Sequence, residues 1–221
     1  LTPSAYAYVS PGMPASPIAQ TFREANGELF TDAHHGDEVI QEMNDLLDEG
    51  LEEVGKTREE LAENIAYKTM DSDSSLQAAQ IFQQMWKENL GVELGIDQST
   101  WAIHLDMAHS GEMKFGYMGW VGDYNDPMTF MDLLITDSSQ NYSGWSNAEY
   151  DALIEKAQNT IDAEERMQAM LDAEKISMKE LPVAPYAYGA DRLMERDYVK
   201  GIVRLPILVA SGKKWAYILE H

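Results

Sequence analysis

The sequence predicts an α/β fold with a mainly parallel β-α-β-α-β core and flanking helices. Ile65, Tyr67 and Thr69 alternate with other residues, and apolar residues alternate again over residues 92–96, as in half-buried strands. Between them, residues 76–90 carry apolar side chains on one helix face, and Gly91 provides a helix stop. A strand, a helix and a strand within about thirty residues form a βαβ unit, so the two strands are expected to be parallel with a right-handed crossover.

The segment before this core is predicted to be an extended lead-in followed by an acidic helix pair. Residues 1–36 show little periodicity and are interrupted by prolines, so we expect an extended chain that packs over another part of the protein. Residues 37–63 contain 11 of the 38 acidic residues, which favours amphipathic helices with a solvated acidic face over a functional acidic patch. Their apolar stripe consists of Leu46, Leu47, Leu51 and Val54.

The core is predicted to continue into one more helix and one more strand. Ser99 or Thr100 can cap a short helix that ends near Gly111. A third strand is predicted over residues 115–121. These two elements complete the β-α-β-α-β order.

Two further helices are predicted after the core. Ser146 and Glu149 have the spacing of a capping box, and Asp162 can cap a helix that stops before Pro182. A methionine stripe on the second helix is expected to fill the core. It consists of Met167, Met170 and Met178. Residues 183–188 contain a proline, which would confine a strand there to an edge or a bulge.

Composition excludes several classes of function. The 221 residues contain 38 Asp and Glu against 16 Lys and Arg, a formal charge of −22, which repels phosphate backbones, so no nucleic-acid partner is expected. The absence of cysteine excludes disulfides, thiolate metal sites and cysteine nucleophiles. His34 and His35 lack further ligands at a diagnostic spacing. We therefore expect no metal and no cofactor.

The candidate ligand site lies where the second and third predicted strands end. Ligands of open α/β sheets bind outside the carboxyl ends of the strands, and Trp101 and Trp120 both fall there. Trp120 leads into residues 121–127, which include Asp123. In one interpretation this stretch is a turn, in which Asp123 or Asn125 accepts backbone hydrogen bonds before the next helix. In the other, Asp123 holds a cationic ligand group between two indole walls. Both interpretations remain open.

Catalytic interpretations have less support. Asp123 and Asp126 have the residue types of a glycosidase carboxylate pair, but so acidic a chain contains such pairs by chance. The sequence contains no G-x-S-x-G motif and no glycine-rich phosphate loop. We therefore expect a protein that is not an enzyme.

Residues 119–127, with the sequence GWVGDYNDP, resemble the signature of the oligopeptide- and dipeptide-binding proteins, the extracellular solute-binding components of peptide ABC importers. The TF and LL pairs that follow extend the resemblance, as does the nineteen-residue step from Trp101 to Trp120. Weaker similarities occur in residues 84–92, 147–154 and 181–185. The resemblance covers roughly residues 1–218.

The resemblance implies a periplasmic-binding-protein-like lobe. The family fold has two α/β lobes that close on a ligand, and this chain is similar to the C-terminal lobe only, so the N-terminal lobe would be missing from it. Residues 1–190 would then form the ligand-binding lobe, with residues 1–36 as its lead-in. Residues 191–218 would be the segment that returns to the first lobe, and residues 219–221 a remnant of a cloned affinity tag.

The resemblance also implies a function. The protein would capture a peptide outside the cell and deliver it to the permease subunits of an ABC transporter, either as a cell-surface lipoprotein or in a periplasm. Asp123 would pair with the ligand's α-ammonium, and Trp101 and Trp120 would line side-chain pockets. The alternatives are another solute, such as an oligosaccharide or a metal chelate, and with less support a hydrolase.

The chain departs from the family pattern at the other end of the ligand. Some oligopeptide-binding members carry basic residues at the positions of Ser75, Ala108 and Tyr117, where they help to neutralise the peptide's C-terminal carboxylate. None of the three is basic here. We expect Tyr117 to contact the ligand without supplying that charge.

Overall fold

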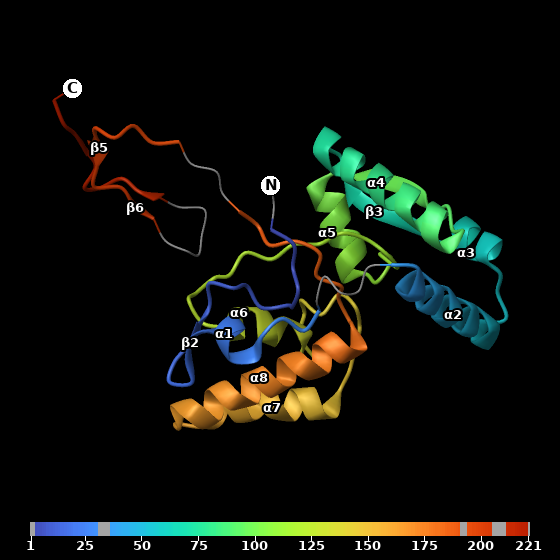
Figure 1. Ribbon diagram of the computed structural model, residues 1–221, viewed down its shortest axis with the longest axis horizontal. Helices are drawn as coiled ribbons and strands as arrows, with labels where there is room; N and C mark the ends of the chain where they lie inside the picture. Colours follow the sequence, from blue (N-terminus) through green and yellow to red (C-terminus); the bar gives the residue numbers. More distant parts are fainter. Residues whose placement is uncertain (1–2, 31–35, 191–193, 205–210, 221) are drawn as a thin grey trace. The chain divides into compact units, whose positions relative to one another are not determined.

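The computed structural model describes residues 3–30, 36–190, 194–204 and 211–220 (Figure 1). It divides into two compact units: unit 1 comprises Leu1–Thr31 and Trp120–His221, and unit 2 comprises Asp32–Gly119. Both units contain helices and short strands, which confirms the α/β class. Among the described helices, none is long and apolar enough to cross a membrane.

The βαβ unit is the centre of unit 2. Strand β3 (Ala66–Met70) leads into helix α4 (Asp73–Leu90), which is followed by strand β4 (Gly95–Ser99) and helix α5 (Trp101–His109). β3 and β4 pair in parallel along their whole length, from Ala66 opposite Gly95 to Met70 opposite Ser99. The predicted parallel pair is therefore confirmed, although the second strand begins three residues later than residue 92.

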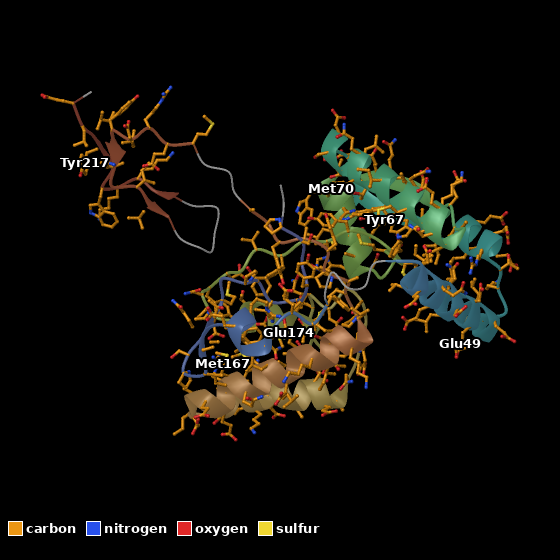
Figure 2. All side chains as sticks on the ribbon, in the orientation of Figure 1. Glu49, Tyr67, Met70, Met167, Glu174 and Tyr217 are labelled. Carbon is orange, nitrogen blue, oxygen red and sulfur yellow. The ribbon has the colours of Figure 1, made fainter. Side chains whose placement is uncertain are left out.

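An aromatic cluster attaches α4 to β3. Tyr67 and Thr69 are the buried residues of β3, as the alternation predicts. Tyr67 is labelled in Figure 2. The Tyr67 ring lies edge-on to Phe82 and Trp86 of α4, with ring centroids 6.1 and 5.3 Å apart, and to Phe115 at 5.5 Å. Such edge-to-face contacts add to the free energy gained by burying the rings.

The prediction of a third strand over residues 115–121 is wrong. In its place the structure has a single parallel bridge at Gly116. Gly116 pairs with Lys68 in parallel, and the Lys68 backbone bonds Phe115 and Tyr117 at 2.9 and 3.0 Å. A Cβ on Gly116 would lie 2.9 Å from the Lys68 carbonyl oxygen, so only glycine fits at this point. Glycines recur at every third position from Gly116 to residue 122, and they give a strand no side chains to pack.

The acidic helix pair is confirmed as α2 (Asp37–Val54) and α3 (Arg58–Asn64). Leu51 is the buried member of the predicted stripe, whereas Leu46 and Val54 are exposed. The stripe prediction was therefore too wide, because an amphipathic pattern does not say how much of a face a neighbouring element covers.

Arg58 joins three helices of unit 2. Its guanidinium donates to the Asn44 side chain and the Leu90 carbonyl, at 2.9 and 2.6 Å, and to Asp48 at 2.6 Å. These acceptors lie on α2 and at the end of α4, so one planar donor satisfies groups from both helices.

Gly91 and Gly50 offer a matched pair of mutations, because Gly91 ends one helix of unit 2 and Gly50 lies inside another. Gly91 ends α4 with φ +66°, in the left-handed region, whereas Gly50 lies inside α2 where an added Cβ meets nothing within 4 Å. Gly91→Ala is expected to destabilise the chain by about 1 kcal/mol, and Gly50→Ala to stabilise it by about 0.5–1 kcal/mol. Urea unfolding followed by circular dichroism would check the opposite signs. Equal effects would contradict the assigned helix ends.

Unit 1 is mainly helical (Figure 1). Its elements before residue 190 are β1 (Pro14–Ala15), β2 (Ala19–Thr21), α1 (Phe22–Asn26), α6 (Met128–Met131), η1 (Asp132–Leu134), α7 (Ala148–Asn159) and α8 (Ala163–Glu180). α7 and α8 lie side by side, and their buried faces enclose a core with α1 and α6. The predicted methionine stripe of α8 is buried, as expected of core-filling residues.

One of the two predicted helix caps in unit 1 is correct. Asp162 accepts the backbone N–H groups of Glu164 and Glu165 at 2.9 and 3.0 Å, as predicted for α8. The cap of α7 is Asn147 rather than Ser146. Asparagine and serine cap helices about equally well, so the capping-box spacing alone could not separate neighbouring residues.

The lead-in packs into the core of unit 1, but it is more ordered than predicted. Its residues form a hairpin and a helix whose N-cap, Thr21, makes a capping box with Glu24. Val9 and Phe22 are fully buried in the core. The predicted packing is confirmed, whereas the purely extended conformation is wrong, because the capping box provides a helix signal within the proline-rich stretch.

A buried carboxylate on α8 attaches this lead-in. Glu174, labelled in Figure 2, is fully buried and accepts the Val9 N–H at 2.8 Å. Its other oxygen accepts from the Asn26 side chain at 2.7 Å and forms an ion pair with Arg23. Val9 and two residues of α1, Arg23 and Asn26, thus converge on one α8 side chain.

The C-terminal segment forms two short antiparallel pairings. β5 (Val199–Lys200) pairs with β8 (Tyr217–Ile218), and β6 (Val203–Arg204) pairs with β7 (Ser211–Gly212). The side chains of Trp215, Tyr217 and Ile218 are exposed. In residues 183–188, where an edge strand or bulge was considered, the structure has a single bridge from Ala187 to Ser4.

Candidate functional site

Unit 1 contains an open pocket of about 560 Å³ beside the loop that carries Asp123. Among the described residues it is lined by Trp120, Asp123, Tyr124, Thr129, Asp132, Leu133, Ile135, Asp137, Ser138, Ser139 and Gln140. Three of these are carboxylates and none is Lys, Arg or His. The pocket therefore suits a cationic group next to an apolar or aromatic one.

The loop is closed by hydrogen bonds that leave the Asp123 carboxylate exposed. The Asp123 N–H donates to Oγ1 of the buried Thr129 at 2.9 Å. Asp126 accepts the Met128 N–H at 2.9 Å, and Pro127 is the N-cap of α6. The turn interpretation is thus right about the turn but wrong about the side chain that accepts the backbone hydrogen bond, which is Asp126 and not Asp123 or Asn125.

Asp126 is also paired with Arg166 of α8. Nη1 and Nη2 of Arg166 donate to Oδ2 and Oδ1 of Asp126 at 2.8 and 2.9 Å. The hydrogen bond to Asp126 raises the pKa of Arg166. With both oxygens occupied, Asp126 is unsuited to act with Asp123 as a glycosidase carboxylate pair.

Asp123 forms no ion pair with any residue that the structure describes. Trp120, at the start of the same loop, is 38% exposed, so part of its ring faces solvent. The structure therefore places Trp120 and Asp123 on the lining of one pocket, where the exposed Asp123 carboxylate has no ion-pair partner among the described residues.

Asp132 is a second carboxylate of the pocket, which sequence reasoning missed. Partial burial raises its pKa, the Tyr124 hydroxyl donates to it at 3.3 Å, and nearby Asp123 raises the pKa further. Burial and the charge of Asp132 raise the pKa of Tyr124 to about 12. The pocket thus carries more negative charge than its own residues neutralise.

Asp132→Asn is expected to raise the thermal stability of the chain at pH 7. Because the pKa of Asp132 is raised on folding, its ionised form opposes folding, and the folded state gains stability as pH falls through that pKa. The amide keeps an acceptor for Tyr124 but removes the charge, a gain of below about 1 kcal/mol at a partly exposed site. Thermal melts at pH 7 and at acidic pH would check this. A gain that persists once Asp132 is protonated would contradict it.

The other two predicted ligand residues belong to unit 2. Trp101 is the first residue of α5 and is 53% exposed, and Tyr117 is half-buried after the Gly116 bridge. His104, fully buried in α5, lies 2.7 Å from the Tyr117 carbonyl through Nε2 and 3.3 Å from Ser99 Oγ through Nδ1. Since a carbonyl only accepts, Nε2 carries the proton. His104 therefore fixes the backbone at Tyr117.

The described part of the chain contains no group of three or more His, Cys, Asp or Glu that could hold a metal ion. His34 and His35 lie outside the described residues.

Comparison with protein families gives one match. The model of the bacterial extracellular solute-binding proteins, family 5 (middle region), matches residues 2–142. This range contains all four predicted ligand residues.

Several curated relatives are named as peptide-binding proteins. The chain is 32% identical over 194 residues to the oligopeptide-binding protein OppA of Bacillus subtilis, covering 87% of this chain and 35% of the relative. It is 34% identical over 161 residues to the periplasmic murein peptide-binding protein MppA of Escherichia coli, covering 71% and 29%. The chain thus spans about a third of the length of these relatives.

Solved structures share the fold. The substrate-binding domain of an oligopeptide ABC transporter from Bacillus anthracis superposes with a TM-score of 0.77 at 24% identity, covering 99% of this chain and 41% of that one. The murein tripeptide-binding protein MppA of Escherichia coli superposes with a TM-score of 0.65 at 29% identity, covering 83% and 35%. The predicted periplasmic-binding-protein-like fold is thereby confirmed.

Proposed function

The chain belongs to family 5 of the bacterial extracellular solute-binding proteins, and from this premise we propose that it binds the amino end of a peptide for an ABC importer. The observation that carries the proposal is the Asp123 carboxylate, which lines the pocket beside Trp120 without an ion pair among the described residues. The family is one of solute-binding proteins, and the proposed role includes no catalysis.

A peptide α-ammonium suits this arrangement. A hydrogen bond between charged groups contributes about 1.5–3 kcal/mol, more than one between neutral groups. The Trp120 and Tyr124 rings, which line the same pocket, offer flat apolar surface to the first side chain of the peptide at small cost in conformational entropy. Asp132 adds negative charge that favours a cation further.

Unit 2 is proposed to supply the remaining predicted contacts, Trp101 and Tyr117. We further propose that the chain, residues 1–190 with the C-terminal segment 191–218, forms the C-terminal lobe of a two-lobed protein. Its N-terminal lobe would close over the ligand. The partners would then be a peptide and the permease subunits, and the location would be outside the cytoplasmic membrane, on the cell surface or in a periplasm. The peptide-binding relatives support this proposal.

Calorimetric titration of the two-lobed protein would test the function. A pool of free-amine peptides is expected to bind, and mass spectrometry is expected to recover every peptide intact. N-acetylated copies of the same peptides, which lack the α-ammonium, are expected to bind at least about tenfold more weakly. Oligosaccharides serve as the control for aromatic stacking without charge. Preferential sugar binding, or hydrolysis of the peptides, would overturn the proposal.

A further inference from the structure

We propose that Arg166 is a positioning residue for the peptide site, through its bidentate contact with Asp126. This inference rests on the proposed function, because it assigns Arg166 the task of holding Asp123 where the α-ammonium binds. Arg166 is absent from the pocket lining and lies on α8, 40 residues along the chain from Asp126.

A short series of contacts connects Arg166 to Asp123. The guanidinium occupies both oxygens of Asp126, and Oδ1 of that carboxylate also accepts the Met128 N–H that begins α6. The next residue, the buried Thr129, accepts the Asp123 N–H at 2.9 Å. Arg166 therefore fixes the C-terminal end of the same short loop whose other end presents Asp123.

The geometry calls for arginine and not merely for a positive charge. Both side chains are about 30% exposed, so the pair is partly shielded from water. Two parallel N–H···O bonds fix the plane of the carboxylate, whereas a lysine ammonium would supply a point charge that leaves that plane free to rotate. Because Oδ1 also holds the Met128 N–H, rotation of this carboxylate would disturb the start of α6.

A role for Arg166 as a charge alone makes the opposite prediction. The positive charge of Arg166 reaches Tyr124 of the pocket, where it weakly opposes the larger effects that raise the pKa of that hydroxyl. A positive charge near a cation site weakens cation binding, so its removal would strengthen the binding of a free-amine peptide. Loss of a positioning contact would weaken that binding. The sign of the change therefore separates the two roles.

The test compares three changes in the two-lobed protein. Arg166→Met removes both the charge and the two hydrogen bonds, and Arg166→Lys keeps the charge but loses the bidentate geometry. The combined variant Arg166→Met with Asp126→Asn removes the pair without changing the net charge. Lys175→Met is the matched control, because Lys175 lies on the same helix in an ion pair with Asp172 in which both side chains are about half-exposed. Circular dichroism establishes which variants fold.

Two readouts are used. The first is the ratio of affinities for a free-amine peptide and its N-acetylated form. The second is the hydrogen-exchange rate of the Asp123 amide, which reports on the loop without any ligand. The three Arg166 variants are expected to lower the ratio by about tenfold and to speed exchange at Asp123, while Lys175→Met changes neither. If Arg166→Met does not fold, Arg166→Lys carries the test.

Each contrary result has a distinct meaning. If the wild-type protein prefers the free amine and Arg166→Lys keeps that preference, Arg166 is not a positioning residue and the proposed function stands. If Arg166→Met binds the free-amine peptide more tightly, its role is that of a charge, and the inference is overturned. If the wild-type protein binds both peptide forms equally, the proposed function fails and the inference fails with it.

Discussion

Asp123→Asn is expected to weaken the binding of a free-amine peptide to the two-lobed protein by about tenfold or more. The change keeps the size of the side chain and its backbone bond to Thr129, but it replaces the ionised carboxylate with a neutral amide, so that only the ammonium of the pair stays charged. A loss of about 1.4 kcal/mol, near the low end of the range for a hydrogen bond to a charged group, corresponds to about tenfold in affinity. Isothermal titration calorimetry would measure it.

Two controls separate the specific contact from general charge. The N-acetylated peptide has no ammonium, so its affinity should be the same for the wild-type protein and for Asp123→Asn. Asp137→Asn removes an equal charge from another exposed residue of the same pocket and should cost less, because a charge at longer range is screened by water. Equal losses from Asp123→Asn and Asp137→Asn would contradict the assignment of Asp123 as the ammonium partner.

Glu174→Ala is expected to lower the free energy of unfolding by about 3–5 kcal/mol, the largest stability effect that the structure predicts. The Glu174 side chain is fully buried and that of Arg23 is 11% exposed, so the guanidinium would be left in the interior without its counter-charge. The Val9 N–H would lose its acceptor as well, and the Asn26 amide would keep only its hydrogen bond to the Leu171 carbonyl. Urea unfolding of the 221-residue chain would measure the loss.

The matched control is Glu155→Ala on the exposed face of α7, where the same change should cost within about 0.5 kcal/mol. Glu174→Gln should fall between the two, since the amide oxygen still accepts one hydrogen bond but the charge is lost. If Glu174→Ala were no more harmful than Glu155→Ala, the lead-in would not depend on this carboxylate.

The sequence is sufficient to predict the centre of unit 2. Alternation over residues 65–69, the helix stop at Gly91 and the parallel crossover are local signals, and local signals determine elements that pack mainly on each other. The prediction of a third strand was wrong because strand pairing there does not depend on local signals alone. The apolar residues after Gly116 suggest a strand, but whether a chain pairs beyond its first bridge depends on contacts distant in sequence.

In the candidate site, too, local features could be predicted from the sequence, whereas contacts between distant residues could not. The loop signature identifies Trp120 and Asp123 on one pocket, because the turn, the aromatic ring and the carboxylate are adjacent in sequence. The roles of Asp126 and His104 depend on partners elsewhere. Asp126 takes Arg166 from a helix 40 residues away, and His104 takes the Tyr117 carbonyl. The periodicity of a single sequence gives no signal for such pairs.

The attachment of the lead-in to α8 has a consequence for the order of folding. Val9 and Glu174 are 165 residues apart in sequence, whereas the paired strands of unit 2 are joined by Lys68 and Asp97, only 29 residues apart. Contacts of short sequence separation form faster, because less loop-closure entropy opposes them. During synthesis unit 2 can therefore fold before α8 is made, and the lead-in can attach to α8 only afterwards. Unit 1 is therefore expected to complete its fold after unit 2.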